Sequence, residues 1–295
     1  MALVNLGGKA SPTDASAFAI GAGKCAFIVP ITGANASEIA SAAREIESSA
    51  ANLVEWRVDH LDSLESPMIQ GALQVLKRET TRPILATFRT QMQGGQGNPS
   101  ESLRIAKVIL EAGVDALDIE DTDPAADEIA ELAYSHAAVP VLSVHDFRGT
   151  PGVEALLKKL NELQDRVISW HGDAVKAARR ADALRPSQGR ADVLEHRGPG
   201  IIKIACMPNK PMDALNIAVA ARRFADVYQK VPFITLSMGT YGEITRAFAG
   251  ALGCSATFVS LAEQASAPGQ IDVDALASFA DVTNALNIPP SHSAQ

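Results

Sequence analysis

The chain has 295 residues, of which 47% are hydrophobic and 20% are charged, as in an ordinary globular protein. Its net charge of -8 argues against a broad surface for nucleic acid or for an anionic membrane, and favours at most a local basic pocket for a small anion. No apolar run approaches the roughly 18 residues that cross a bilayer, and the first residues lack a signal-peptide pattern. The three cysteines show no metal-ligand spacing, so we expect a cytoplasmic protein with free thiols and no metal.

Short apolar runs recur along the chain and alternate with amphipathic helical patterns. We predict strands at 24–30, 53–59, 82–89, 114–120, 139–145, 201–207, 232–238 and 255–261. Among the helices, 36–49 begins with a Ser/Glu signal and 102–113 ends at a glycine cap. Because the strands are apolar on both faces, they fit a parallel sheet that helices cover.

This alternation predicts one α/β domain over residues 1–295, folded as a (β/α)8 TIM barrel. A doubly wound open sheet is the alternative. The first strand–helix turn, VPITGANAS, lacks the glycine fingerprint of a dinucleotide fold and so disfavours that alternative.

The connection between strand 5 and strand 6 is much longer than the others. A helix is expected at 152–163, and the stretch at about 171–200 has the composition of an insertion, rich in Ala and Arg and broken by Pro186 and Gly189. A surface helical excursion is the simpler interpretation, and a lid or an oligomer contact is the sharper one.

Two terminal segments lie outside the repeated pattern. Residues 1–22 form an N-terminal extension, and we expect 1–20 and 288–295 to be mobile tails.

Charged and polar residues interrupt or follow the apolar strands. They are Glu55, Arg57 and Asp59 on the second strand, Arg89 on the third, Asp118 and Glu120 on the fourth, Ser143 and His145 on the fifth, Lys203 on the sixth, and Arg246 after the seventh. Because the chemistry of such barrels gathers at the C-terminal ends of the strands, we expect these side chains to share a site. A structural ion-pair network is the alternative, and it stays open for a single carboxylate such as Asp118.

Lys203 stands inside the apolar run IIKIACM. Burial and nearby arginines such as Arg57, Arg89 or Arg246 would lower its pKa and leave a neutral amine that can attack a ketone to form an imine. His145, at the end of the neighbouring strand, is the best candidate for the proton shuttle. The arginines would hold an anionic substrate, so the pattern predicts a Schiff-base enzyme for a small keto acid. Dehydration and aldol cleavage both remain possible.

Six stretches carry a family resemblance. They are VEWRVDHLD (54–62), ATFRTQMQGG (86–95), SVHDF (143–147), KIACMPN (203–209), TLSMGTYGEITR (235–246) and SATFVSLAEQASAPGQI (255–271). In these stretches, and in their order, the sequence resembles the type I 3-dehydroquinate dehydratases. The resemblance covers residues 25 to about 285.

The resemblance implies a (β/α)8 barrel, usually a homodimer, that uses no metal or organic cofactor. It implies dehydration of 3-dehydroquinate to 3-dehydroshikimate, a step of the shikimate pathway that aromatic amino acid biosynthesis and quinate breakdown both use. Lys203 would form the imine, and His145 would help form and hydrolyse it, remove the α-proton and assist departure of the hydroxyl. Arg246 would pair with the substrate carboxylate.

The resemblance also implies the remaining contacts of the substrate. Glu55, Arg57 and Arg89 would bind ring hydroxyls or position the substrate, and Met238 and Phe258 would line the pocket. Ser266, Ala267 and Gln270 would belong to a closing loop that excludes water.

Gln93 departs from the family, which usually carries a glutamate there, near the catalytic histidine. A glutamine brings no negative charge, so it should not raise the pKa of His145 as a carboxylate would. The acidic limb of activity should therefore lie lower than in Gln93→Glu. Two other functions stay open: a non-catalytic barrel for quinate-like compounds, which Gln93 supports, and another Schiff-base lyase or aldolase.

Overall fold

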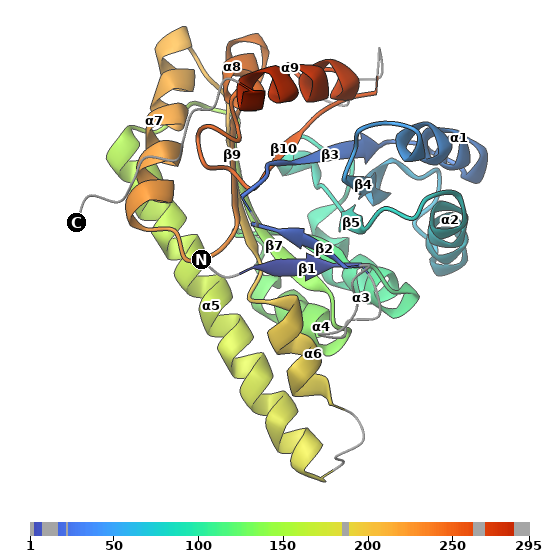
Figure 1. Ribbon diagram of the computed structural model, residues 1–295. Coiled ribbons are helices and arrows are strands. Elements are labelled where there is room, and N and C mark those ends of the chain that lie inside the picture. Colours follow the sequence, from blue (N-terminus) through green and yellow to red (C-terminus); the bar gives the residue numbers. More distant parts are fainter. Residues whose placement is uncertain (1–2, 8–16, 22, 185–188, 262–268, 286–295) are drawn as a thin grey trace.

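The structure is a computed structural model that describes residues 3–7, 17–21, 23–184, 189–261 and 269–285 (Figure 1). One parallel sheet forms its centre. In the order in which they pair, its strands are β10 (Ala256–Phe258), β3 (Ala26–Ile31), β4 (Leu53–Arg57), β5 (Ile84–Thr87), β6 (Ala116–Glu120), β7 (Val139–Asp146), β8 (Ile201–Cys206) and β9 (Phe233–Ser237). Ser255 connects the two edge strands, because its backbone N–H donates to the carbonyl of Phe233 at 2.8 Å. The predicted (β/α)8 barrel is confirmed as a nearly closed barrel.

Helices surround this barrel and cover the outer faces of its strands (Figure 1). They are α1 (Ala36–Glu47), α2 (Ser66–Glu79), α3 (Ser102–Ala112), α4 (Ala126–Ser135), α5 (Val153–Leu184), α6 (Arg190–Arg197), α7 (Pro211–Val227), α8 (Glu243–Ala247) and α9 (Val273–Ala285). Short 3-10 turns are η1 (Val58–His60), η2 (Gln91–Gln93), η3 (Pro99–Glu101) and η4 (Thr240–Gly242).

Local signals in the sequence set several of these boundaries. Asn35 caps α1, because its side chain accepts from the backbone N–H groups of Ser37 and Glu38. Gly113 ends α3 with a φ of 82°, a conformation that glycine adopts without strain, and its N–H donates to two carbonyls of the last turn. The glycine cap expected at the end of 102–113 is therefore confirmed.

The barrel interior is apolar at the end where the strands begin. Leu53, Leu85, Val141 and Ile234 belong to one buried cluster there, together with Ile201 of β8. The charged residues lie further along the strands. This division leaves the C-terminal ends of the strands for polar chemistry.

The described parts of the N-terminal segment, residues 3–7 and 17–21, hold two paired strands where a mobile tail was expected. Val4–Leu6 (β1) and Phe18–Ile20 (β2) pair as antiparallel strands, and Val4, Leu6 and Ile20 are buried in the apolar cluster of the barrel. Burial of these side chains stabilises the hairpin, although neither strand is long enough to be recognised from its own sequence. The other expected tail, 288–295, lies outside the described residues.

The predicted helix and much of the predicted insertion form one continuous helix. α5 has 32 residues and extends past the barrel, with α6 beside it (Figure 1). Gly172 lies inside it, but the buried stripe Leu163, Val167 and Val175 continues on both sides and outweighs the helix cost of about 1 kcal/mol for one glycine. The projecting part of α5 and α6, here called the arm (residues 170–197), shares a small apolar cluster with Tyr134 of α4.

The arm is fixed to the hairpin at the end of the barrel where the strands begin. Arg197 of α6 donates to the carbonyl of Asn5 at 3.1 Å and to that of Gly7 at 2.8 Å. Asn5 donates in turn to the carbonyl of His196 at 2.6 Å. The arm is thus a helical excursion, as the simpler interpretation holds, and it does not lie over the catalytic end as a lid.

Candidate active site

Lys203 is the third residue of β8, and its side chain lies inside the barrel. Its neighbours Ile202 and Ile204 pack outward against helices, because side chains alternate along a strand. The lysine side chain is 6% exposed, and Nζ lies 3.5 Å from Oδ2 of Asp118 and 4.4 Å from the centre of the Phe258 ring. An apolar strand can therefore carry a lysine, since the ammonium group meets a carboxylate and an aromatic face inside the barrel.

Arg89 links the two carboxylates of β6. Nη2 lies 2.8 Å from Oδ2 of Asp118, and Nη1 lies 3.0 Å from Oε2 of Glu120. The Ser143 hydroxyl donates to Oδ1 of Asp118 at 2.7 Å and also lies 3.1 Å from Glu120. All four side chains are buried, so these charges are paired rather than solvated.

His145 lies at the C-terminal end of β7, two residues beyond Ser143, which pairs with Lys203 in the sheet. Its Nδ1 lies 2.8 Å from Oε2 of Glu120, and its backbone N–H donates to Oε1 of the same residue at 3.0 Å. Both oxygens of one carboxylate thus contact the histidine.

Burial and charge shift the protonation of these groups. Burial lowers the pKa of Lys203, and the pull of Asp118 does not outweigh burial and Arg89. Burial also lowers the pKa of His145, with Arg89 and Lys203 adding to the effect.

The two carboxylates shift in opposite directions. Burial would raise the pKa of Asp118, but Arg89 and Lys203 outweigh it and hold that pKa well below its usual range. Burial raises the pKa of Glu120 to about 7, and Asp118 adds to the rise while Arg89 opposes it. An amine and an imidazole whose pKa values are both lowered therefore meet a carboxyl group whose pKa is about 7 in one site.

The charged residues of β4 have their own partners. Glu55 accepts from the Thr87 hydroxyl at 2.9 Å. Arg57 forms a two-pronged pair with Asp59, at 2.8 and 2.7 Å. Asp59 also accepts the backbone N–H of Arg89 at 3.2 Å, so this pair fixes the turn that follows β5.

Arg246 on α8 is the cation with the least compensation in the site. It is 2% exposed, Nη1 donates to the carbonyl of Phe258 at 3.2 Å, and its buried Nε has no partner among the described residues. Burial lowers its pKa to about 10. A buried guanidinium group without a carboxylate partner in the described structure can receive an anionic group of a ligand.

The end of the predicted closing loop meets the end of β9. Gly269 has a φ of 79°, and a Cβ placed on it would lie 2.2 Å from the carbonyl oxygen of Gly239. Met238 and Gln270 flank this contact along the chain, and both are half-buried. Ser266 and Ala267 lie outside the described residues.

The side-chain oxygen of Gln93 bonds within its own turn. Its Oε1 accepts from the Thr90 hydroxyl at 2.7 Å and from the Thr90 N–H at 3.3 Å, which caps the turn η2. Glu120 is the carboxylate that contacts the histidine. Gln93 instead satisfies the start of its own turn, and its place near the histidine stays a prediction.

The sequence placed Asp118, Glu120 and Ser143 at strand ends but assigned them no role. Their positions two residues apart on buried strands place them on the same face as the catalytic candidates, and this was the signal that could have found them. The structure brings all three into contact with Arg89, Lys203 or His145.

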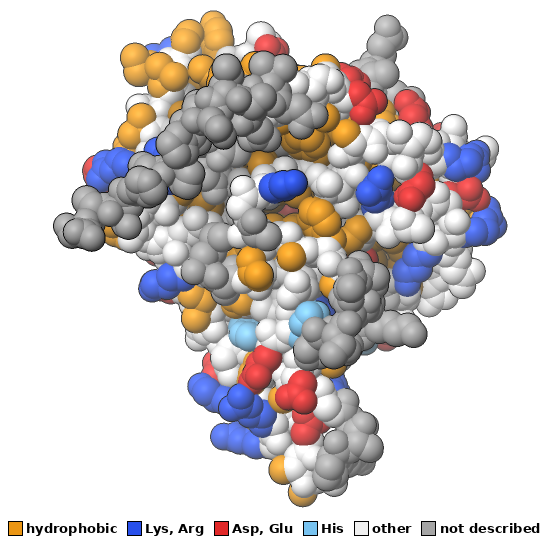
Figure 2. All heavy atoms as spheres, viewed as in Figure 1, with side chains coloured by type: hydrophobic (Ala, Val, Ile, Leu, Met, Phe, Trp, Pro, Cys, Tyr) orange, Lys and Arg blue, Asp and Glu red, His pale blue; other side chains and the backbone are white. Residues whose placement is uncertain are grey.

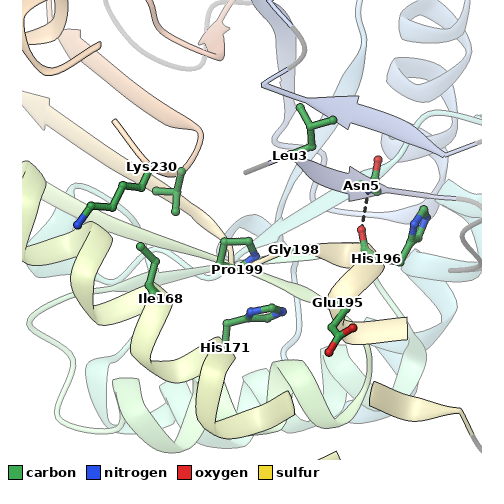
Figure 3. A pocket seen from close by; sticks show the side chains of 10 residues that line it. Leu3, Asn5, Ile168, His171, Glu195, His196, Gly198, Pro199 and Lys230 are labelled. Atoms are coloured by element: carbon green, nitrogen blue, oxygen red, sulfur yellow. Dashed lines mark hydrogen bonds between the residues drawn. The ribbon is translucent and has the colours of Figure 1, made fainter. Parts of the chain in front are cut away.

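A cavity of about 690 Å³ lies at the end of the barrel where the strands begin (Figure 3). Leu3, His171 and Pro199 are among its lining residues, which come from the N-terminal segment, the arm and the segments before β8 and β9. None of the predicted catalytic or substrate-binding residues lines it. It therefore belongs to the junction of the hairpin and the arm.

The described residues show neither a metal site nor a membrane-spanning helix. They contain no group of three or more His, Cys, Asp or Glu side chains placed to hold a metal ion. Within the same residues, no helix is both long and apolar enough to cross a bilayer.

Comparison with known proteins identifies the family. The model of the family described as type I 3-dehydroquinase matches residues 27–185 and 166–286, two segments that overlap within α5. The 3-dehydroquinate dehydratase of Enterococcus faecalis (strain ATCC 700802 / V583) is 33% identical over 267 residues, which are 88% of this chain and 93% of that protein. The 3-dehydroquinate dehydratase of Klebsiella pneumoniae (strain 342) is 30% identical over 273 residues, with 88% and 94% covered.

A solved structure agrees with these relatives. The type I 3-dehydroquinate dehydratase of Clostridium difficile, determined with covalently modified comenic acid, superposes with a TM-score of 0.73 at 27% identity. The superposition covers 91% of this chain and 96% of that chain. The chain therefore belongs to the type I 3-dehydroquinase family, a family of hydro-lyases, as its six sequence stretches predicted.

Proposed function

We propose that this chain dehydrates 3-dehydroquinate to 3-dehydroshikimate through an imine on Lys203, with His145 as general acid and base. The observation that carries the proposal is the buried Lys203 amine, which faces Asp118 at 3.5 Å inside the barrel. The names of the curated relatives support the substrate.

The lysine acts as the nucleophile. Its lowered pKa increases the fraction of neutral amine, which attacks the ring ketone and, with loss of one water, gives a protonated imine. Asp118 is held ionised by Arg89 and Lys203, so it faces the positive charge of that imine. The protonated imine withdraws electrons and acidifies the adjacent C–H.

His145 then moves the protons. Its Nε2 takes the α-proton and leaves an enamine, and the same nitrogen returns the proton to the departing hydroxyl, which leaves as water. Water finally hydrolyses the conjugated imine, which releases the enone product and restores the lysine.

Arg246 is the proposed partner of the substrate carboxylate. Its buried, incompletely paired guanidinium group gives a bidentate site without displacing a protein carboxylate. We propose substrate contacts at Met238 and Phe258 as well, since Phe258 lies against both Arg246 and Lys203.

The remaining predicted contacts stay proposals. They are Glu55, Arg57 and Arg89 on the ring hydroxyls, and Ser266, Ala267 and Gln270 on the closing loop. Arg89 already pairs with two carboxylates, so we propose that it orients the network rather than binds substrate alone.

We propose that the protein is a homodimer, and its cytoplasmic location stays a prediction from the sequence. Figure 2 shows hydrophobic side chains over one end of α7, in its upper left part. Met212, Leu215 and Val219 are exposed on α7, and Ile244 and Phe248 are exposed on α8. Such a patch is suited to burial against a second copy, and light scattering on wild type and Val219→Glu would test it.

Borohydride trapping tests the reaction. Wild type, incubated with 3-dehydroquinate and sodium borohydride, should gain the mass of the reduced adduct, while Lys203→Ala should not. Enone absorbance is followed in parallel without borohydride. A folded wild type that gives neither adduct nor enone would refute the proposed function.

The same assay addresses the alternatives. Release of a small aldehyde or pyruvate instead of an enone would favour a lyase or aldolase. Ligand binding without turnover would favour the non-catalytic barrel, which Gln93 supports, whereas the contact of Glu120 with His145 supports catalysis.

A further inference from the structure

Glu120 contacts His145 in two places at once. Oε1 accepts the backbone N–H at 3.0 Å, and Oε2 lies 2.8 Å from the ring nitrogen Nδ1. The glutamate is 7% exposed, so water does not compete for these contacts. We propose that Glu120 is the positioning residue that fixes the ring and the tautomer of His145, an inference that rests on the proposed dehydration.

The loop after β5 does not supply this function. Gln93 is bound to Thr90, and the neighbouring Gly94 lies so close to the ring of Phe147 that a Cβ there would meet it at 2.7 Å. Phe147 stacks on His145, with ring centres 6.5 Å apart. In the described structure the loop thus reaches the imidazole through Phe147, while strand β6 contacts it directly.

The surrounding charges select one tautomer. Arg89 can only donate, and its Nη1 lies 3.0 Å from Oε2 of Glu120 and 3.3 Å from Nδ1 of His145. When Glu120 is ionised, Oε2 accepts from both Arg89 and the Nδ1–H group. Nδ1 then carries the ring proton, and Nε2 keeps the lone pair that a general base needs.

Other charged groups near the ring also act on this pair. Asp118 on β6, Lys203 on β8 and Arg57 on β4 each influence the pKa of His145, in addition to Arg89 on β5. Asp146 follows His145 on β7. A variant of Glu120 leaves these groups in place, so its effect reports the contact with Glu120 itself.

The pair can also hold the proton between the two chemical steps. After Nε2 has taken the α-proton, the ring carries two N–H groups, and the Nδ1 proton can pass to Oε2 of Glu120. Burial raises the pKa of Glu120 to about 7 and lowers that of His145, so the carboxylate can take a proton from the doubly protonated ring. The proton returns to Nδ1 when Nε2 gives its own proton to the leaving hydroxyl.

The test compares Glu120→Gln and Glu120→Asp with wild type, and uses Asp121→Asn as a matched control. Asp121 directly follows Glu120 but pairs with Lys159 and Arg166 of α5, outside the barrel. Glu120→Gln should lower kcat by about 10- to 100-fold, within the usual range for a general acid–base contribution, with little change in KM. Glu120→Asp keeps the charge and should recover part of that loss.

Two further measurements separate positioning from mere structure. The acidic limb of kcat/KM should move to lower pH by about one unit or more in Glu120→Gln, because the carboxyl group that takes the first proton of the pair near pH 7 is lost and only the imidazole, with its lowered pKa, still titrates. It should stay in place in Asp121→Asn. In wild type without substrate at pH 8, ¹⁵N NMR should show His145 as the Nδ1–H tautomer, with the signal assigned by its loss in His145→Phe.

The outcomes are distinct. An Nε2–H tautomer in wild type, or an unchanged acidic limb and kcat in a folded Glu120→Gln, would overturn the inference. Absence of enone with wild type would instead refute the proposed function, while the tautomer measurement would still decide what Glu120 does to the ring.

Discussion

The amine of Lys203 and the carboxylate of Asp118 lie 3.5 Å apart, and the same carboxylate oxygen also pairs with Arg89 at 2.8 Å. One oxygen thus faces two cations inside the barrel. Asp118 raises the pKa of Lys203 but does not cancel the effect of burial. The arrangement lowers the pKa of the amine and places a negative charge beside it, where the proposed imine cation would form.

Asp118→Asn should form the imine at lower pH than wild type does. It should also dehydrate the substrate more slowly. Without the carboxylate the pKa of Lys203 falls further, by about one unit or more, so borohydride trapping should persist to lower pH. Turnover should drop by about 10- to 100-fold, because the imine cation loses its counter-charge. Trapping and enone formation measured across pH check both effects. A trapping profile that moves to higher pH would contradict the prediction.

Glu120→Gln should stabilise the fold at pH 8 while it impairs activity. The pKa of Glu120 is about 7 in the folded protein and near 4.5 when unfolded, so its contribution to stability is fully present below pH 4.5. That contribution is lost as the pH rises through 7. Glutamine resembles the protonated acid, so at pH 8 the variant should gain about 2 kcal/mol in free energy of unfolding.

Urea unfolding at pH 8 and pH 4 measures this difference. The gain over wild type should be present at pH 8 and nearly absent at pH 4. Asp118→Asn should behave in the opposite way, because the pKa of Asp118 is lowered on folding and its contribution is lost as the pH falls. Equal stability of Glu120→Gln and wild type at pH 8 would argue against a raised pKa.

Arg246→Gln should raise KM by about 10- to 100-fold and change kcat less, because a charge-assisted contact to the substrate carboxylate is worth about 1.5–3 kcal/mol. Steady-state kinetics measure the split. Arg222→Gln is the matched control, since Arg222 is half-exposed and pairs with Asp226 on the surface of α7. Similar losses in both variants would remove Arg246 from the substrate site.

Gly269→Ala should reduce kcat/KM by about tenfold without unfolding the barrel. The methyl group would lie 2.2 Å from the carbonyl oxygen of Gly239, and the φ of 79° disfavours alanine. The loop end must therefore shift. Gly71→Ala, in an open position on α2, is the control and should not lower activity. Kinetics and circular dichroism on both variants decide the matter.

Much of this fold follows from local sequence. Six of the eight central strands lie within the predicted runs, and β3 and β7 each extend one residue beyond theirs, because strands buried on both faces are largely apolar. Lys203 and His145 were predictable as inward residues from the alternation of side chains along β8 and β7.

Contacts between segments that are distant in the sequence could not be predicted from local patterns. The three-residue strands β1 and β2 depend on burial against the barrel, which no local pattern reveals. The continuity of α5 through Gly172 depends on packing along its whole length. The contact of Glu120 with His145 requires the register of β6 against β7, which pairs Glu120 with Ser143. A comparison of residue types pointed instead to Gln93, whose side-chain oxygen bonds with Thr90.

The length of α5 has a consequence for how the molecule rotates in water. A helix of 32 residues is about 48 Å long, and its outer part projects beyond a nearly round barrel. Rotation of the molecule about the long axis of α5 is then faster than rotation that reorients this axis. Amide N–H bonds of α5 lie along the axis, whereas those of the strands point across the sheet. The two sets of amides should therefore show different rotational correlation times. ¹⁵N relaxation of the amides of α5 would then report the orientation of the long axis of the molecule.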